Sequence, residues 1–120
     1  MIKAKRIKIY NKFNGHCAYC GKKIKYSQMQ VDHLEPKHLA HMKPDVNNND
    51  YENLMPSCQK CNIHKGGMML KTWRKELALQ VTRLRKNAQF DRALRFGQLY
   101  VSENPIIFYY EKYKSVKVES

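Results

Sequence analysis

The stretch CAYCGKK, residues 17–23, decides the fold of this chain. Its two cysteines have the spacing CxxC, and a second pair with the same spacing occurs in CQKC at residues 58–61. Each CxxC can form a tight turn that directs both sulfurs at one ion, and two such turns complete the tetrahedral shell that zinc prefers. A redox dithiol would use one pair and leave the other unexplained. We therefore expect one structural Zn²⁺, without an open coordination position, bound by Cys17, Cys20, Cys58 and Cys61.

The chain is short and strongly basic. Its 120 residues fit a single domain, 1–120, and 23 Lys and Arg stand against 10 Asp and Glu, for a net charge of +13. Such a field attracts polyanions, and against DNA its binding energy would come mostly from counterion release. A basic surface without a specific partner is the plainer alternative.

No apolar run approaches the roughly 20 residues that span a bilayer. The first residues, MIKAKRIKIYNKFNG, carry charges throughout, whereas a signal peptide needs an uninterrupted apolar core. We expect a cytoplasmic protein with no membrane partner. Thiols are normally reduced in that compartment, which favours a metal site over disulfides.

Hydrophobic periodicity predicts two strands and a helix around the cysteines. A short strand is expected at 29–34, ended by Pro36, with a returning strand in NLMPS, residues 53–57. A short helix should start around CQKC and stop at Gly66 and Gly67. The predicted fold class is α+β: a zinc-stapled ββα core at 13–67 with a helical and strand appendage at 68–113.

The appendage has helical spacing at first. Apolar residues from Leu70 to Ala88 recur every three or four positions, Thr72 is a candidate N-cap, and a shorter helix is expected near 90–97. We expect the apolar stripe to pack on the zinc core. The aromatic and β-branched run IIFYYEKY, residues 106–113, predicts a terminal strand.

Between the cysteine pairs lie Asp-His at 32–33 and Asn-Leu at 53–54, and Cys61 opens a Cys-Asn-x-x-Lys-Gly run. This combination resembles HNH endonucleases of the ββα-metal (His-Me finger) superfamily, in the variant with asparagine in place of the last histidine. The resemblance covers 13–67. The remainder is more weakly similar to the tail of small phage- and prophage-type HNH proteins.

The resemblance implies a role for each matching residue. His33 would be the general base, Asp32 and Asn62 would hold one catalytic Mg²⁺ (or Mn²⁺) through oxygen ligands, and Asn53 would brace the loop that carries His33. Four basic residues are candidate phosphate contacts: Lys65, Lys22, Lys23 and Arg74.

Plainer roles remain open for these residues. His33 alone could be a packed core histidine, and Asn62 could cap a helix. Neighbouring residues on an ideal strand point to opposite faces, so Asp32 and His33 share one site only if the strand end is twisted or bulged. His38 and His41 lie in a polar stretch that we interpret as a surface loop.

The resemblance implies a metal-dependent DNA endonuclease that nicks or cuts, leaving 5′-phosphate and 3′-hydroxyl ends. Three alternatives stay open: a zinc-stabilised nucleic-acid-binding or regulatory module, a structure-specific junction resolvase, and a structural adaptor in a phage packaging or defence assembly. The sequence leaves the oligomeric state open.

Overall fold

A computed structural model describes residues 1–36 and 49–113. The chain divides into two compact units, Met1–Leu70 with Ile107–Ser120, and Lys71–Ile106. All four cysteines belong to the first unit, together with both strands. His38 and His41 lie outside the described residues, and the expectation of a single domain stays a prediction.

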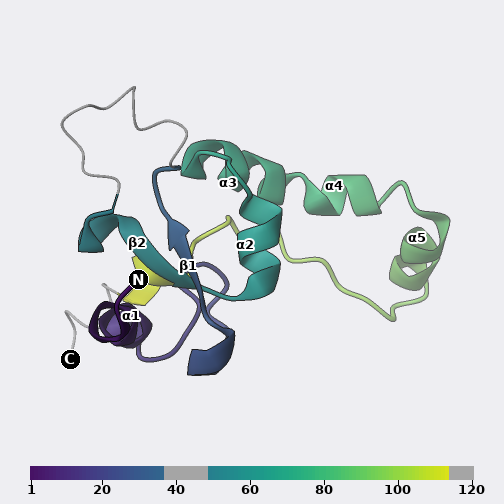
Figure 1. Cartoon of the computed structure of the whole chain (residues 1–120). Helices are drawn as coiled ribbons and strands as arrows, with labels where there is room; N and C mark the ends of the chain where they lie inside the picture. Colours follow the sequence, from purple (N-terminus) through teal and green to yellow (C-terminus); the bar gives the residue numbers. More distant parts are fainter. Residues whose placement is uncertain (37–48, 114–120) are drawn as a thin grey trace. The chain divides into compact units, whose positions relative to one another are not determined.

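The first unit is built around a two-stranded antiparallel sheet. Strand β1 spans Gln30–His33 and pairs with β2, Leu54–Ser57, so that Asp32 lies opposite Met55 and His33 opposite Leu54. Helix α2, Gln59–Lys65, follows β2 directly (Figure 1). This order confirms the predicted strand, strand and helix.

In the described part of this unit, a further helix and three 3₁₀ turns precede the two strands or lead into them. Helix α1 spans Lys3–Tyr10 and runs into η1, Asn11–Phe13. The turn η2, Tyr26–Gln28, leads into β1, and η4, Tyr51–Asn53, leads into β2. Both strands thus follow closely on a 3₁₀ turn, and each is four residues long.

The core beneath the sheet is small and apolar. Its buried members are Ile9, Ile24, Met29 and Leu54, and Val31 packs against them. Burying each such side chain stabilises the fold by about 1.5–3 kcal/mol. All of β2 is buried, including Pro56, whose carbonyl accepts a hydrogen bond of 2.9 Å from the Ala18 N–H. The first cysteine turn is thereby attached to the sheet.

The predicted terminal strand is wrong: residues 109–113 are helical. The N–H groups of Tyr109 and Tyr110 donate to the carbonyls of Tyr19 and Ala18 at 3.0 and 2.8 Å. Glu111 Oε1 accepts from the Phe108 N–H at 2.9 Å, as the acidic residue of a capping box does. These contacts satisfy donors at the start of a helix, and they override the strand preference of the aromatic run.

The second unit contains helix α3 (Leu70–Ala78) from Lys71 onward, together with α4 (Gln80–Leu84) and α5 (Ala88–Arg95). The predicted N-cap at Thr72 is wrong, because the chain re-enters a helix at Leu70 soon after α2 ends and Thr72 lies in its first turn. Farther along the chain, Asn87 is the N-cap of α5, and its Oδ1 accepts a hydrogen bond from the Phe90 N–H at 3.0 Å. Packing of the apolar stripe on the zinc core stays a prediction.

The predicted α+β class is confirmed, with the terminal strand replaced by a helical turn. Within 1–36 and 49–113, no helix combines the length and the apolar character needed to cross a bilayer.

Candidate functional site

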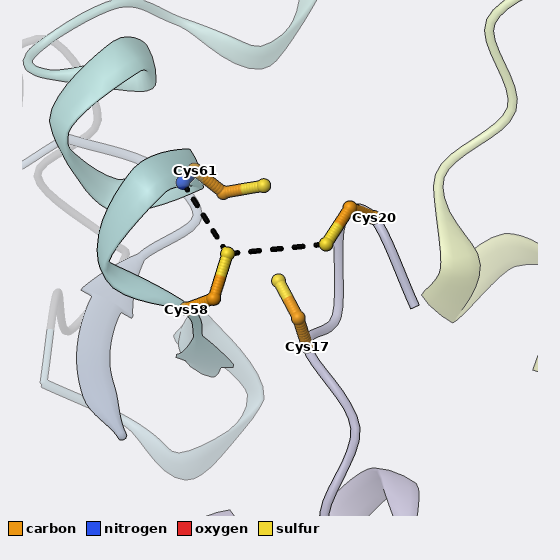
Figure 2. Close-up of side chains that lie close together, drawn as sticks. All are labelled: Cys17, Cys20, Cys58 and Cys61. Atoms are coloured by element: carbon orange, nitrogen blue, oxygen red, sulfur yellow. Dashed lines mark hydrogen bonds between the residues drawn. The ribbon is translucent and has the colours of Figure 1, made fainter. Parts of the chain in front are cut away.

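Four thiols converge between the first cysteine turn and the start of α2. The sulfurs of Cys17, Cys20, Cys58 and Cys61 all lie within 4.8 Å of one another, and Cys20 Sγ is 3.8 Å from Cys58 Sγ. Figure 2 shows the four side chains pointing toward a common centre, two from a loop and two from the first turn of the helix. The tertiary structure therefore joins two pairs that are far apart in the sequence.

Local backbone geometry holds each pair in place. In the first pair, the Gly21 N–H donates to the Cys17 carbonyl at 3.0 Å, and the Cys17 N–H donates to the Lys22 carbonyl at 2.8 Å. In the second pair, Cys58 is the N-cap of α2 and its Sγ accepts from the Cys61 N–H at 3.4 Å. Thiolate sulfur accepting backbone N–H bonds is common where cysteines bind metal at a helix start.

The cluster fits a tetrahedral metal. Zn–S bonds of about 2.3 Å in a tetrahedron place the sulfurs about 3.8 Å apart, which is the separation of Cys20 and Cys58. Hydrogen bonding from the Cys61 thiol lowers the pKa of Cys17 to about 4, and the same bond with burial raises the pKa of Cys61. The four cysteines are thus arranged to bind a metal ion, as predicted.

Asp32 projects from β1 into a buried polar contact. Its Oδ2 accepts a hydrogen bond from the Tyr19 hydroxyl and lies 3.1 Å from Lys65 Nζ. Asp32 is 7 % exposed and Lys65 is 1 % exposed. Burial raises the pKa of Tyr19, and the Asp32 carboxylate raises it further, so the hydroxyl remains a donor.

His33 has different neighbours from Asp32. Its Nε2 lies 3.0 Å from Asn49 Oδ1, and the ring lines an open pocket of about 530 Å³ beside Ile2 and Lys5. No bulge interrupts the pairing of β1 with β2. The two adjacent side chains therefore contact different parts of the unit, as alternation along a strand requires.

Asn53 braces the segment that follows His33. Its Oδ1 accepts from the Glu35 N–H at 2.7 Å, its Nδ2 donates to the Glu35 carbonyl at 3.2 Å, and its own carbonyl accepts from the Leu34 N–H at 2.8 Å. These are the contacts expected of a bracing asparagine. Asn53 is 7 % exposed, so its role is internal.

Asn62 lies on α2 three residues before Lys65. Residues three apart share a helix face, and Lys65 reaches Asp32 on β1, so Asn62 shares the face of α2 that turns toward β1. The placement of its carboxamide beside the Asp32 carboxylate stays a prediction. His64, two residues after Asn62, is exposed.

One predicted phosphate contact is wrong. Lys65 is buried, and its Nζ donates to the His33 carbonyl at 3.0 Å as well as pairing with Asp32. It therefore has an internal role. Lys22 and Lys23 are exposed and line an open groove of about 330 Å³ with Lys60. Arg74, in the second unit, donates to the Ile106 carbonyl at 2.7 Å.

Sequence reasoning missed two residues of this site. Tyr19 lies between the cysteines of the first pair, and Asn49 lies in a polar stretch, so no periodicity marked either. Only the contact of Tyr19 with Asp32, and that of Asn49 with His33, reveals them.

Comparisons with known proteins agree with this geometry. Residues 17–67 match the family model described as HNH endonuclease. The CRISPR-associated endonuclease Cas9 of Corynebacterium diphtheriae is 33 % identical over 67 residues, which is 56 % of this chain and 6 % of that protein. The Type II-C Cas9 enzyme from Actinomyces naeslundii superposes with a TM-score of 0.50 at 27 % identity over 61 % of this chain and 7 % of that one. The chain thus spans a small fraction of both relatives.

Proposed function

We propose that residues 17–67, which match the HNH endonuclease family model and carry paired cysteine turns, form an HNH domain, and that this protein is a metal-dependent DNA endonuclease that hydrolyses phosphodiester bonds. The observation that carries the proposal is the pair of adjacent residues at the end of β1. Asp32 offers a carboxylate toward α2, and His33 offers an imidazole toward an open pocket.

Asp32 and Asn62 are the proposed ligands of a catalytic divalent cation. Carboxylate and carboxamide oxygens suit Mg²⁺ or Mn²⁺, which need few protein groups because water and phosphate complete the shell. In support, Tyr19 and Lys65 both contact Oδ2, and among the described residues no hydrogen bond or ion pair reaches Asp32 Oδ1. A bound cation would stabilise negative charge that develops on the phosphoryl group and the leaving oxygen.

His33 is the proposed general base. Asn49 Oδ1 can only accept, so the ring donates from Nε2 and keeps the lone pair of Nδ1 for a proton. A histidine suits this work near neutral pH, since its unperturbed pKa is about 6.5. The pocket beside the ring supplies room for the attacking water.

The opposite orientations of Asp32 and His33 suit in-line displacement. In that reaction the attacking oxygen and the leaving oxygen lie on opposite sides of phosphorus. A phosphate over the end of β1 would meet His33 on one side and the Asp32 and Asn62 oxygens on the other. The expected products are 5′-phosphate and 3′-hydroxyl ends.

The four cysteines are proposed to hold a structural Zn²⁺. Four thiolates leave no position for water or substrate, so this ion would stabilise the arrangement of the strand and helix. It would take no part in the hydrolysis.

A basic groove is proposed to bind the DNA backbone. Lys22, Lys23 and Lys60 line it together with three glutamines, and among the described residues no acidic side chain lines it. Lysines neutralise phosphates, and glutamines can donate to phosphate oxygens or base edges.

Cleavage of supercoiled plasmid with Mg²⁺ tests the proposal. We expect nicked or linear DNA from the wild type, none with EDTA, and a loss of about 10²-fold or more in rate for His33→Ala, within the usual range for a general base. His64→Ala is the matched control and should cut like the wild type, because His64 is exposed on α2. Equal cutting by His33→Ala would refute the role of His33, and uncut plasmid with every divalent cation would refute the activity.

A further inference from the structure

Tyr19 links the first cysteine turn to the carboxylate of Asp32. The hydroxyl of this buried tyrosine donates to Asp32 Oδ2, and Lys65 Nζ lies 3.1 Å from the same oxygen. Lys65 also donates to the His33 carbonyl at 3.0 Å. One carboxylate oxygen thus receives two donors, one from the loop between Cys17 and Cys20 and one from the last residue of α2.

The second carboxylate oxygen, Asp32 Oδ1, has a different environment. Within 1–36 and 49–113, no hydrogen bond or ion pair reaches Asp32 Oδ1, although the side chain is only 9 % exposed. A buried carboxylate oxygen without a donor is costly unless a cation or water satisfies it. The arrangement therefore orients the carboxylate, with Oδ2 held and Oδ1 left with its lone pairs.

The tyrosine is itself held at several points. Its carbonyl accepts from the Tyr109 N–H at 3.0 Å, and its neighbour Ala18 donates to Pro56 of β2 at 2.9 Å. Its ring packs edge-on against Phe108 with ring centroids 5.7 Å apart. With so many contacts the hydroxyl has little freedom to leave Asp32, and the cysteine turn sets where it points.

We propose that Tyr19 and Lys65 are positioning residues that fix Asp32 Oδ2 so that Oδ1 faces the divalent cation held with Asn62. This inference rests on the proposed function, because it concerns the same cation. Partners that orient a metal ligand from outside its coordination shell commonly contribute 10–100-fold to metal affinity. The cysteine turn would then supply a hydrogen bond to the catalytic site in addition to its structural zinc.

Manganese binding without DNA is the primary test. The dissociation constant of Mn²⁺ is measured by electron paramagnetic resonance on the full zinc-loaded chain, for wild type, Asp32→Ala and Tyr19→Phe. We expect Asp32→Ala to abolish specific binding and Tyr19→Phe to weaken it about 10-fold.

Tyr10→Phe is the matched control. It deletes the same hydroxyl in the same unit, where Tyr10 Oη donates to the Ile24 carbonyl at 2.7 Å. Its affinity for Mn²⁺ should equal that of the wild type. Zinc content and the thermal midpoint are recorded for each variant, and Lys65→Arg serves as a second variant if Tyr19→Phe does not fold.

A purely structural role for Tyr19 predicts different kinetics. If positioning is lost, the cleavage rate of Tyr19→Phe recovers at saturating Mg²⁺, whereas a folding defect does not recover. Wild-type Mn²⁺ affinity in Tyr19→Phe, or specific binding retained in Asp32→Ala, would overturn the inference. A wild type that binds Mn²⁺ at Asp32 yet leaves all DNA uncut would refute the nuclease proposal and leave the positioning role standing.

Discussion

Lys65 Nζ lies 3.1 Å from Asp32 Oδ2, with the lysine side chain 1 % exposed and the aspartate side chain 9 % exposed. This ion pair joins the end of α2 to β1 inside the first unit. Removing one partner of such a pair leaves an uncompensated buried charge, which costs about 3–5 kcal/mol.

Lys65→Met should therefore lower the free energy of unfolding by about 3–5 kcal/mol, measured by chemical denaturation of the zinc-loaded protein. Lys60→Met is the matched control, because Lys60 lies on the same helix but is exposed. Its unfolding free energy should stay within about 0.5 kcal/mol of the wild type. Equal stability of the two variants would show that the ion pair contributes nothing.

Zinc removal should unfold the first unit. The first cysteine turn and the start of α2 meet at the four thiols, and in small metal-stapled folds the free energy of metal binding is folding free energy. We expect about one Zn per chain by elemental analysis, and none in Cys17→Ser. Far-ultraviolet circular dichroism should report lost structure in that variant and in chelated wild type.

Adding zinc back is the control for the chelated protein. Refolding on addition of one equivalent would show that the loss of structure follows from the metal and not from the chelator. A Cys17→Ser protein that stays folded without zinc would contradict the structural role.

Gly21→Ala should be destabilising for two reasons. Gly21 has φ +80°, and a Cβ there would lie 2.6 Å from Tyr109 Cδ1. The Tyr109 ring cannot move aside freely, because it stacks on His16 with centroids 5.4 Å apart. The backbone strain alone costs about 1–2 kcal/mol, and the clash adds to it.

Gly97→Ala separates the cost of backbone strain from the cost of the steric clash. Gly97 has φ +71°, and a Cβ there meets nothing within 4 Å. We expect its loss of unfolding free energy to stay at about 1–2 kcal/mol, clearly below that of Gly21→Ala. If both variants lose the same amount in denaturant titrations, the contact with Tyr109 has no energetic effect.

The salt dependence of DNA binding should locate the basic groove. Each lost phosphate contact lowers the slope of log K against log salt by about 0.9 on duplex DNA. Lys22→Ala and Lys23→Ala should each show such a change in fluorescence anisotropy titrations. Lys25→Ala is the control, because Lys25 is exposed but does not line the groove. The same slope for all three variants and wild type would exclude the groove.

The spacing of the cysteines predicted the metal cluster, and the apolar alternation and the glycine stop predicted the two strands and α2. CxxC turns and capped helix starts are local structures. A four-coordinate metal bound only by thiolates must use all four cysteines of this chain, so its ligand set is fixed. Each of these elements is determined by residues that lie close together in the sequence.

The terminal helical turn and the position of Lys65 could not be predicted in this way. Residues 109–113 have a strand-like composition, but carbonyls of the first cysteine turn accept the N–H groups that begin their helix. Lys65 follows Asn62 on α2 and was expected to reach a phosphate. Its burial depends on Asp32, which is 33 residues earlier in the chain.

The sequence by itself determined a four-cysteine metal cluster around a motif similar to that of HNH endonucleases, because ligand type and spacing are local properties. The tertiary structure decided which groups surround the Asp32 carboxylate. Tyr19 and Lys65 reach it only because the cysteine cluster and the β1–β2 sheet bring three distant segments together. Burial and pairing of a charge depend on such long-range contacts, and no local pattern of residues encodes them.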